Sequence, residues 1–187
     1  PALPGFECKV IDSDGNILPQ GEAGELVVRS ECNALGYYNR PDAQAERFRD
    51  GWVHTGDMVS CDPDGWFTFR GRVDDQMQVG GENVFPAEVE NILATHPEVR
   101  DVCVVPVPHE VKGQVPVAFV VRNVGSNLGE KELIDYYLTR GPAYSHPRHI
   151  YFIDKMPLLA TGKTDLQALE RQAREPGPGT GPSPLAR

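Results

Sequence analysis

The spacing of apolar residues changes near residue 73, and this change constrains the possible folds more than any other feature of the chain. Residues 6–70 form short strand-like runs, which are separated by turn dipeptides of the Asp-Gly type. One helix is expected among them, beginning at Pro41 and ending before Asp50-Gly51. The sequence therefore predicts that the first part of the chain is mostly β-structure.

Helical and strand-like patterns alternate beyond residue 73. The expected strands are residues 102–105, 115–121 and 150–153. Two helices are expected before the last of these strands, and their predicted buried residues are Val89, Ile92, Leu93, Leu133, Ile134, Tyr137 and Leu138. A final helix is predicted to start at Thr164, whose hydroxyl would form a capping box with Gln167.

These patterns predict an α+β fold with three segments. Residues 1–73 would form a small β-rich subdomain, and residues 74–172 would form a compact α+β domain. Residues 173–187 are rich in proline and glycine. Such a segment buries too little apolar area to offset the entropy lost on ordering, so we expect this tail to be disordered.

The charge of the chain excludes some classes of partner. The 187 residues include 18 Lys and Arg against 27 Asp and Glu, which gives a net charge of −9. General binding to nucleic acid or to anionic membranes requires clustered positive charge, so neither is expected. No run approaches the roughly 18 apolar residues of a membrane span, and the N-terminus does not resemble a signal peptide. We therefore expect a cytoplasmic protein with no transmembrane segment.

The cysteine pattern indicates neither disulfides nor a metal site. The four cysteines lie far apart, without a C-x-x-C pair or a histidine placed to complete a zinc site. Reduced thiols and no bound metal are therefore predicted. The chain also begins at Pro1 and runs directly into strand-like sequence, which is typical of the middle of a longer protein.

Asp57 follows a glycine between two strand-like segments. A carboxylate in this position can accept two hydrogen bonds from a vicinal diol such as that of ribose, and charge-assisted bonds of this kind are stronger than neutral ones. The alternative is an ordinary turn aspartate that binds its own backbone. Taken alone, the segment favours the turn.

The segment from Gly71 to Glu90 combines charged and glycine residues. Arg72 lies beside Asp74 at the predicted domain boundary, where a polar, exposed residue can absorb a backbone rotation at little packing cost. Gly80-Gly81 would let another backbone or a thin ligand approach closely, because no Cβ intervenes. A salt-bridged linker followed by a glycine turn that caps a helix is an equally good interpretation.

A third segment ends in Gly162-Lys163-Thr164, which suggests a nucleotide-binding P-loop. That motif requires glycine where this chain has Pro157, so the P-loop is excluded. A lysine remains on a glycine-containing loop beside a helix N-terminus, where it could reach an anion. The alternative is an ordinary surface lysine.

Together and in this order, the three segments resemble the C-terminal portion of the acyl-adenylate-forming superfamily. This superfamily includes acyl-CoA synthetases, adenylation domains of nonribosomal peptide synthetases and firefly-type luciferases. The resemblance runs from about Gly5 to Leu169, and the matching motifs are residues 54–57, 71–90 and 162–163. It implies that this chain is a C-terminal fragment, inactive without its own N-terminal domain.

The resemblance implies a role for each matching residue. Asp57 would hold the ribose hydroxyls of ATP, and Arg72 would contact the same nucleotide. Lys163 would be catalytic, bridging the substrate carboxylate and the α-phosphate during adenylation. Asp74 would be the hinge between the two domains, and rotation about it would withdraw Lys163 before the thioester forms.

The acceptor side of the site is implied in the same way. After rotation, Gly80 and Gly81 would line the pantetheine channel of CoA. The superfamily often has an aromatic residue, Lys, any residue and Pro where this chain has Tyr144-Ser145-His146-Pro147. Tyr144 and His146 are thus candidate CoA contacts, and the missing lysine would be replaced by Lys112 and Arg148.

The implied function is that of an ATP-dependent acid–CoA ligase that uses ATP, CoA and Mg²⁺, with the Mg²⁺ ligand in the absent N-terminal part. A small carboxylic acid, such as a fatty or aromatic acid, would be adenylated and then transferred to the CoA thiol. One alternative is an adenylation enzyme that loads a carrier protein. Another is a noncatalytic lid that docks on a separate N-terminal partner.

Overall fold

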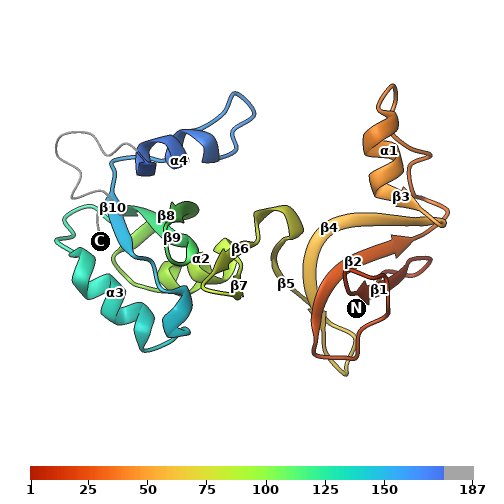
Figure 1. Ribbon diagram of the computed structural model, residues 1–187, viewed down its shortest axis with the longest axis horizontal. Coiled ribbons are helices and arrows are strands. Elements are labelled where there is room, and N and C mark those ends of the chain that lie inside the picture. Colours follow the sequence, from red (N-terminus) through yellow and green to blue (C-terminus); the bar gives the residue numbers. More distant parts are fainter. Residues whose placement is uncertain (175–187) are drawn as a thin grey trace. The chain divides into compact units, whose positions relative to one another are not determined.

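The computed structural model describes residues 1–174 and divides the chain into two compact units (Figure 1). The first unit is Pro1–Asp75, and the second begins at Gln76. The boundary therefore lies two residues beyond the predicted one. Both sheets and helices are present, so the predicted α+β class is confirmed.

The first unit is built on an antiparallel sheet. Its strand order is β1-β2-β4-β3, with β5 paired to the remaining part of β4. The strands are β1 (Glu7–Ile11), β2 (Ala23–Arg29), β3 (Phe48–Arg49), β4 (Trp52–Cys61) and β5 (Phe67–Arg72). Its buried hydrophobic residues are Val10, Ile11, Val27 and Val59.

One short helix of the first unit, α1 (Pro41–Arg47), begins with proline as expected but ends earlier than predicted. Residues 48 and 49 form strand β3 instead of continuing the helix. The reason is the turn that follows, because Asp50 and Gly51 both have positive φ angles, of 51° and 77°. This is the pattern of a two-residue hairpin turn, and it pairs β3 with β4.

The second unit is built on a mixed sheet. Its order is β10-β9-β6-β7, with β8 paired to the other part of β9, and only β10 runs parallel to its neighbour. The strands are β6 (Met77–Val79), β7 (Glu82–Val84), β8 (Val99–His109), β9 (Gly113–Arg122) and β10 (His149–Phe152). The β6–β7 hairpin was not predicted as such from the sequence.

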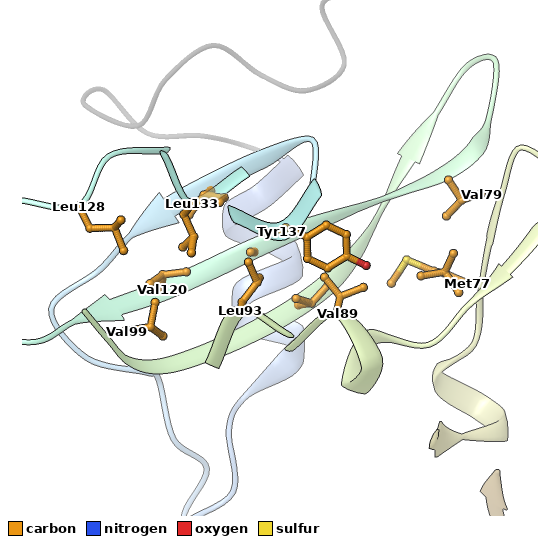
Figure 2. Close-up of a cluster of buried hydrophobic side chains, with 13 residues drawn as sticks. Met77, Val79, Val89, Leu93, Val99, Val120, Leu128, Leu133 and Tyr137 are labelled. Atoms are coloured by element: carbon orange, nitrogen blue, oxygen red, sulfur yellow. The ribbon is translucent and has the colours of Figure 1, made fainter. Parts of the chain in front are cut away.

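Both faces of this second sheet are covered. The α2 (Pro86–Ala94) and α3 (Glu130–Leu138) helices bury Leu93, Leu133 and Tyr137 against one face (Figure 2). Helix α4 (Leu166–Arg174) buries Leu169 and Ala173 on the other. Alternate residues of β8 and β9 enter the two clusters, as expected for strands whose side chains point to opposite faces. Figure 1 shows α3 and α4 on opposite sides of the sheet.

Three details of the second unit correct the sequence analysis. Leu138 is 42% exposed rather than buried. The capping box at Thr164 does not form, because Thr164 pairs with Leu158 in a short β-bridge and α4 starts at Leu166. The cap is Asp165, whose Oδ1 accepts a hydrogen bond from the Ala168 N–H at 3.0 Å.

The predicted disordered tail, 173–187, lies outside the described residues except for its first two positions. Ala173 and Arg174 form the last two positions of α4, so the prediction is wrong for them. All four cysteines lie in the described part, and none forms a disulfide. Among residues 1–174, no helix has the length and apolar character needed to cross a bilayer.

Candidate functional site

Asp57 and Arg72 are direct partners across the β4–β5 pair. The Arg72 Nη1 atom donates to Asp57 Oδ1 at 2.7 Å and to the Thr55 carbonyl at 3.1 Å. Both side chains keep part of their surface open to solvent, 35% for Asp57 and 40% for Arg72. The fold therefore places a carboxylate and a guanidinium together at an accessible position.

Asp57 lies within strand β4 and not in a turn, which removes the turn interpretation of this segment. Its own N–H donates to the Thr55 hydroxyl at 3.0 Å, and that hydroxyl donates to the Leu26 carbonyl of β2. Gly56 interrupts the regular strand with a φ of 71°. The direction of the Asp57 side chain is thus fixed by backbone contacts rather than by a flexible loop.

The strand before Asp57 is fixed by a charged network from β2 and β3. His54 Nδ1 lies 2.9 Å from Glu25 Oε2 and also 2.9 Å from Arg49 Nη2. The other Glu25 oxygen accepts a hydrogen bond from the Gly56 N–H at 3.0 Å. Glu25 was not identified from the sequence, because its proximity to His54 depends on the pairing of β2 with β4.

Arg47 is a second residue that the sequence analysis missed. Its Nη2 atom lies 3.1 Å from Asp74 Oδ2. A Cβ on Gly56 would lie 2.1 Å from Arg47 Nη1 and 3.0 Å from Arg72 Nη2, so two guanidinium groups flank this glycine. The available signal was the Asp50-Gly51 turn, which sets the β3–β4 register and brings Arg47 back alongside β4.

The predicted hinge residue, Asp74, lies in a short 3-10 turn, Val73–Asp75, at the end of the first unit. Its side chain is 63% exposed. Burial raises the pKa of the neighbouring Asp75 and Asp74 adds to this rise, while the positive charge of Arg72 opposes it. Arg72 therefore acts on the acidic boundary turn as well as on Asp57.

In the second unit, Gly80 and Gly81 form the tip of the β6–β7 hairpin, with φ angles of 63° and 95°. A Cβ on either residue would meet no atom within 4 Å, so the tip is open. The Gly80 N–H donates to the Lys112 carbonyl at 2.9 Å. Two of the predicted acceptor-side regions, the glycine pair and Lys112, are therefore adjacent. The glycines form a hairpin turn rather than a helix cap.

We use the term cationic cluster for Lys112, His146 and Arg148. Arg148 Nη1 lies 2.6 Å from His146 Nε2, and His146 Nδ1 lies 2.5 Å from the Ala143 carbonyl. These contacts fit a neutral imidazole that donates from Nδ1 and accepts at Nε2. Burial lowers the pKa of His146, and the charges of Arg148 and Lys112 lower it further.

The two remaining residues of the predicted acceptor motif lie differently. Tyr144 is 43% exposed on a short 3-10 turn, Ala143–Ser145. Ser145, which replaces the superfamily lysine, is buried, and its Oγ lies 2.8 Å from the Tyr137 hydroxyl. Position 145 therefore serves the core in this chain, and the nearby positive charge comes from the cationic cluster.

Lys163 is exposed on a tight loop between Leu158 and Thr164. The Leu159 N–H donates to the Lys163 carbonyl at 2.8 Å, and the Gly162 N–H donates to the Leu159 carbonyl at 2.9 Å. These bonds fix the backbone of the loop while the ammonium group extends into solvent. Within residues 1–174, no group of three or more His, Cys, Asp or Glu residues could hold a metal ion.

Comparison with known proteins shows the family of this chain. Residues 88–163 match the model of the AMP-binding enzyme C-terminal domain. The chain belongs to the acyl-adenylate-forming superfamily. It is 39% identical to feruloyl-CoA synthase from an Amycolatopsis species over 163 residues. This match covers 86% of this chain and 33% of that protein. It is 38% identical over 172 residues to the fatty acid–[acyl-carrier-protein] ligase ScoC of Streptomyces coeruleorubidus, covering 92% and 32%.

Solved structures of the superfamily have the same fold. The o-succinylbenzoate CoA synthetase of Bacillus subtilis, in complex with its acyl-adenylate intermediate, matches with a TM-score of 0.85 and 30% identity over 96% of this chain and 35% of that one. ATP-bound MatB from Rhodopseudomonas palustris also matches with a TM-score of 0.85 and 30% identity, over 94% and 35%. The chain thus spans about a third of the length of the relatives it matches. The predicted resemblance is confirmed.

Proposed function

We propose that this chain is the C-terminal part of an ATP-dependent acid–CoA ligase. The enzyme would convert a carboxylic acid and ATP to an acyl-adenylate and pyrophosphate, and then transfer the acyl group to the thiol of CoA. Residues 1–73 would complete the large nucleotide-binding domain, and residues 74–172 would form its mobile lid. The observation that carries the proposal is the Asp57–Arg72 pair, set in a chain that belongs to this superfamily.

The nucleotide would bind at the Asp57–Arg72 pair. The Asp57 carboxylate would accept hydrogen bonds from the two ribose hydroxyls, while Arg72 holds the carboxylate in place and contacts the same nucleotide. Both side chains are half-exposed and already oriented by strand contacts. Binding would therefore require little rearrangement of these side chains. Little free energy would be lost in ordering them, so the charge-assisted hydrogen bonds would contribute fully to affinity.

Lys163 would supply the charge for the first half-reaction. In the adenylation state its ammonium group would bridge the carboxylate of the acid and the α-phosphate, where negative charge builds up. Two unit charges about 4 Å apart interact by roughly 4 kcal/mol at an effective dielectric constant near 20. A lysine that docks in only one state can thus accelerate one step selectively. Rotation about Asp74 would then withdraw it.

CoA would bind on the second unit in the rotated state. The open tip formed by Gly80 and Gly81 would let the narrow pantetheine arm pass close to the backbone. The cationic cluster would bind a phosphate group of CoA, and the exposed Tyr144 would lie at its edge. This assignment is supported by the hydrogen bond that brings Lys112 next to the glycine tip.

The two cofactors and the metal ion differ in how well these residues fit them. The Asp57–Arg72 pair suits the ribose of ATP, and the cationic cluster suits a CoA phosphate. Residues 1–174 contain no group of three or more His, Cys, Asp or Glu residues that could hold a metal ion. As the superfamily resemblance implies, Mg²⁺ would be bound by the N-terminal part of the enzyme.

A carrier protein is the second candidate acceptor. ScoC, to which the chain is 38% identical, is named as a ligase for an acyl carrier protein. Such a carrier presents the same pantetheine arm, so the glycine tip would serve equally well. The two candidates differ in what binds beyond the arm, a nucleotide phosphate or a protein surface.

The test is ATP–pyrophosphate exchange with the full-length protein that contains this chain, across a panel of aliphatic and aromatic acids. We expect exchange with one class of acid, thioester formation with free CoA, and no exchange by the 187-residue chain alone. Thioester formation only with a holo carrier protein would select the second candidate. No exchange with any acid by a folded protein that still binds AMP would refute the ligase and favour a noncatalytic lid.

A further inference from the structure

Arg47 occupies an unusual position for a charged residue at the end of a surface helix. Its side chain is only 20% exposed, whereas its partner Asp74 is 63% exposed. The guanidinium fills the space left by the absent side chain of Gly56, and a Cβ there would collide with it at 2.1 Å. Arg47 thus reaches Asp74 from a partly buried and confined site.

We propose that Arg47 is a positioning residue for the hinge, which holds the Asp74 carboxylate against the first unit in the described conformation and releases it when the hinge turns. This inference rests on the proposed function, because it takes Asp74 to be the hinge. It adds a residue from α1, a helix that carries none of the sequence-predicted site residues, and it concerns what stabilises the hinge rather than what the enzyme binds.

The electrostatic surroundings of Arg47 support this role. Arg47 and Arg72 both lie against Gly56, so two positive groups share one small region. Arg72 is paired with Asp57. For Arg47, carboxylates lie on two sides: Asp74 at 3.1 Å and the adjacent Glu46 at 3.4 Å. The like charge of Arg72 increases the need for a carboxylate partner, and Asp74 is the one at the domain boundary.

An ordinary surface ion pair is the competing explanation, because such pairs contribute little to stability. The two explanations differ in what they predict for the backbone at the boundary. If Arg47 positions the hinge, its loss should loosen residues 73–76 specifically. If it forms only a surface pair, its loss should leave that segment unchanged or should weaken the whole first unit evenly.

The test is amide hydrogen exchange on the full-length protein that contains this chain, without substrates. We expect Arg47→Met to raise exchange at residues 73–76 about two- to fivefold, which is the range expected for loss of one such pair. Arg47→Lys should retain most of the protection. The double variant Arg47→Asp, Asp74→Arg exchanges the two charges and should restore part of the protection at residues 73–76. If the loss of protection came only from the lost packing of the long Arg47 side chain, the double variant would not restore it.

The matched control is Arg29→Met. Arg29 forms a 2.6 Å ion pair with Glu7, its partner across the β1–β2 strand pair of the same unit. Its loss should leave exchange at residues 73–76 unchanged. Unchanged exchange in Arg47→Met, or an equal rise across the β1–β2 strands, would overturn the inference. Because the measurement uses no substrate, its failure would leave the ligase proposal intact. A negative pyrophosphate-exchange result would in turn leave the measured effect of Arg47 on residues 73–76 intact.

Discussion

The candidate site residues of the two units are held in different ways. In the first unit, Asp57 and Arg72 lie on paired strands and are joined by an ion pair. In the second unit, Gly80, Lys112 and Lys163 all lie on turns or loops, and the side chain of Lys163 is exposed. The difference matches the division of roles that we propose. In it, the first unit binds the nucleotide, and the second unit brings different residues to the site in each half-reaction.

The hydrophobic core, in contrast, is larger in the second unit than in the first. Among residues 1–174, four hydrophobic residues of the first unit are buried, against twenty-five of the second. The second sheet is covered on both faces by helices, whereas the first has one short helix with no buried residue. The unit that we propose to be the lid thus has the larger hydrophobic core, as expected for a domain that would move as a rigid body.

The largest expected loss of stability comes from a substitution in the core of the second unit. Leu133→Ala should lower its free energy of unfolding by about 3 kcal/mol, because Leu133 is fully buried and the substitution leaves a cavity. Val27→Ala in the first unit should cost about 1.5 kcal/mol, the value of two buried methyl groups. Chemical denaturation followed by hydrogen exchange in each unit measures both. An equal loss in both units from either substitution would mean that they unfold as one.

The next effect concerns the open glycine tip. Gly80→Val should destabilise the second unit by about 1 kcal/mol, because a β-branched residue disfavours the φ of 63°. Gly80→Asn is the matched control, since Asn-Gly suits this type of turn. Both variants add a side chain to the proposed pantetheine path. We expect the Asn variant to keep its stability and yet slow thioester formation in the full-length protein. Normal thioester formation would contradict the channel assignment.

The smallest effect concerns the cationic cluster. The pKa of His146 is lowered, mainly by burial, so the unfolded chain binds a proton at this residue before the folded chain does. The second unit should therefore lose stability as pH falls below about 6.5 toward the lowered pKa. His146→Gln should remove this part of the pH dependence. NMR titration of the imidazole checks the direction, and a pKa above the ordinary value would contradict it.

The sequence predicted the elements that local patterns specify. The α+β class, the helix that buries Val89 and Leu93, and the strand at 115–121 follow from apolar spacing and turn residues, and the structure has all three. The errors occur where two signals compete. Thr164 and Asp165 are both good helix caps, and the bridge between Leu158 and Thr164 decides in favour of Asp165.

The contacts within the candidate site show the same difference between local and long-range signals. Motif resemblance identified Asp57 and Arg72, and the structure places them in contact. Arg47 and Glu25 were missed because they belong to no recognised motif and approach the site only through strand register. Long-range pairing of this kind depends on turns such as Asp50-Gly51, which was interpreted as the end of a helix rather than as a hairpin.

The most direct test of the account compares the two half-reactions of Lys163→Ala in the full-length protein. We expect adenylation to fall by about 10²-fold or more, as is usual when a pre-positioned transition-state donor is lost. Thioester formation from supplied acyl-adenylate should be nearly unchanged, because Lys163 would have left the site by then. Equal loss of both half-reactions would contradict a lid that delivers this lysine in one state only.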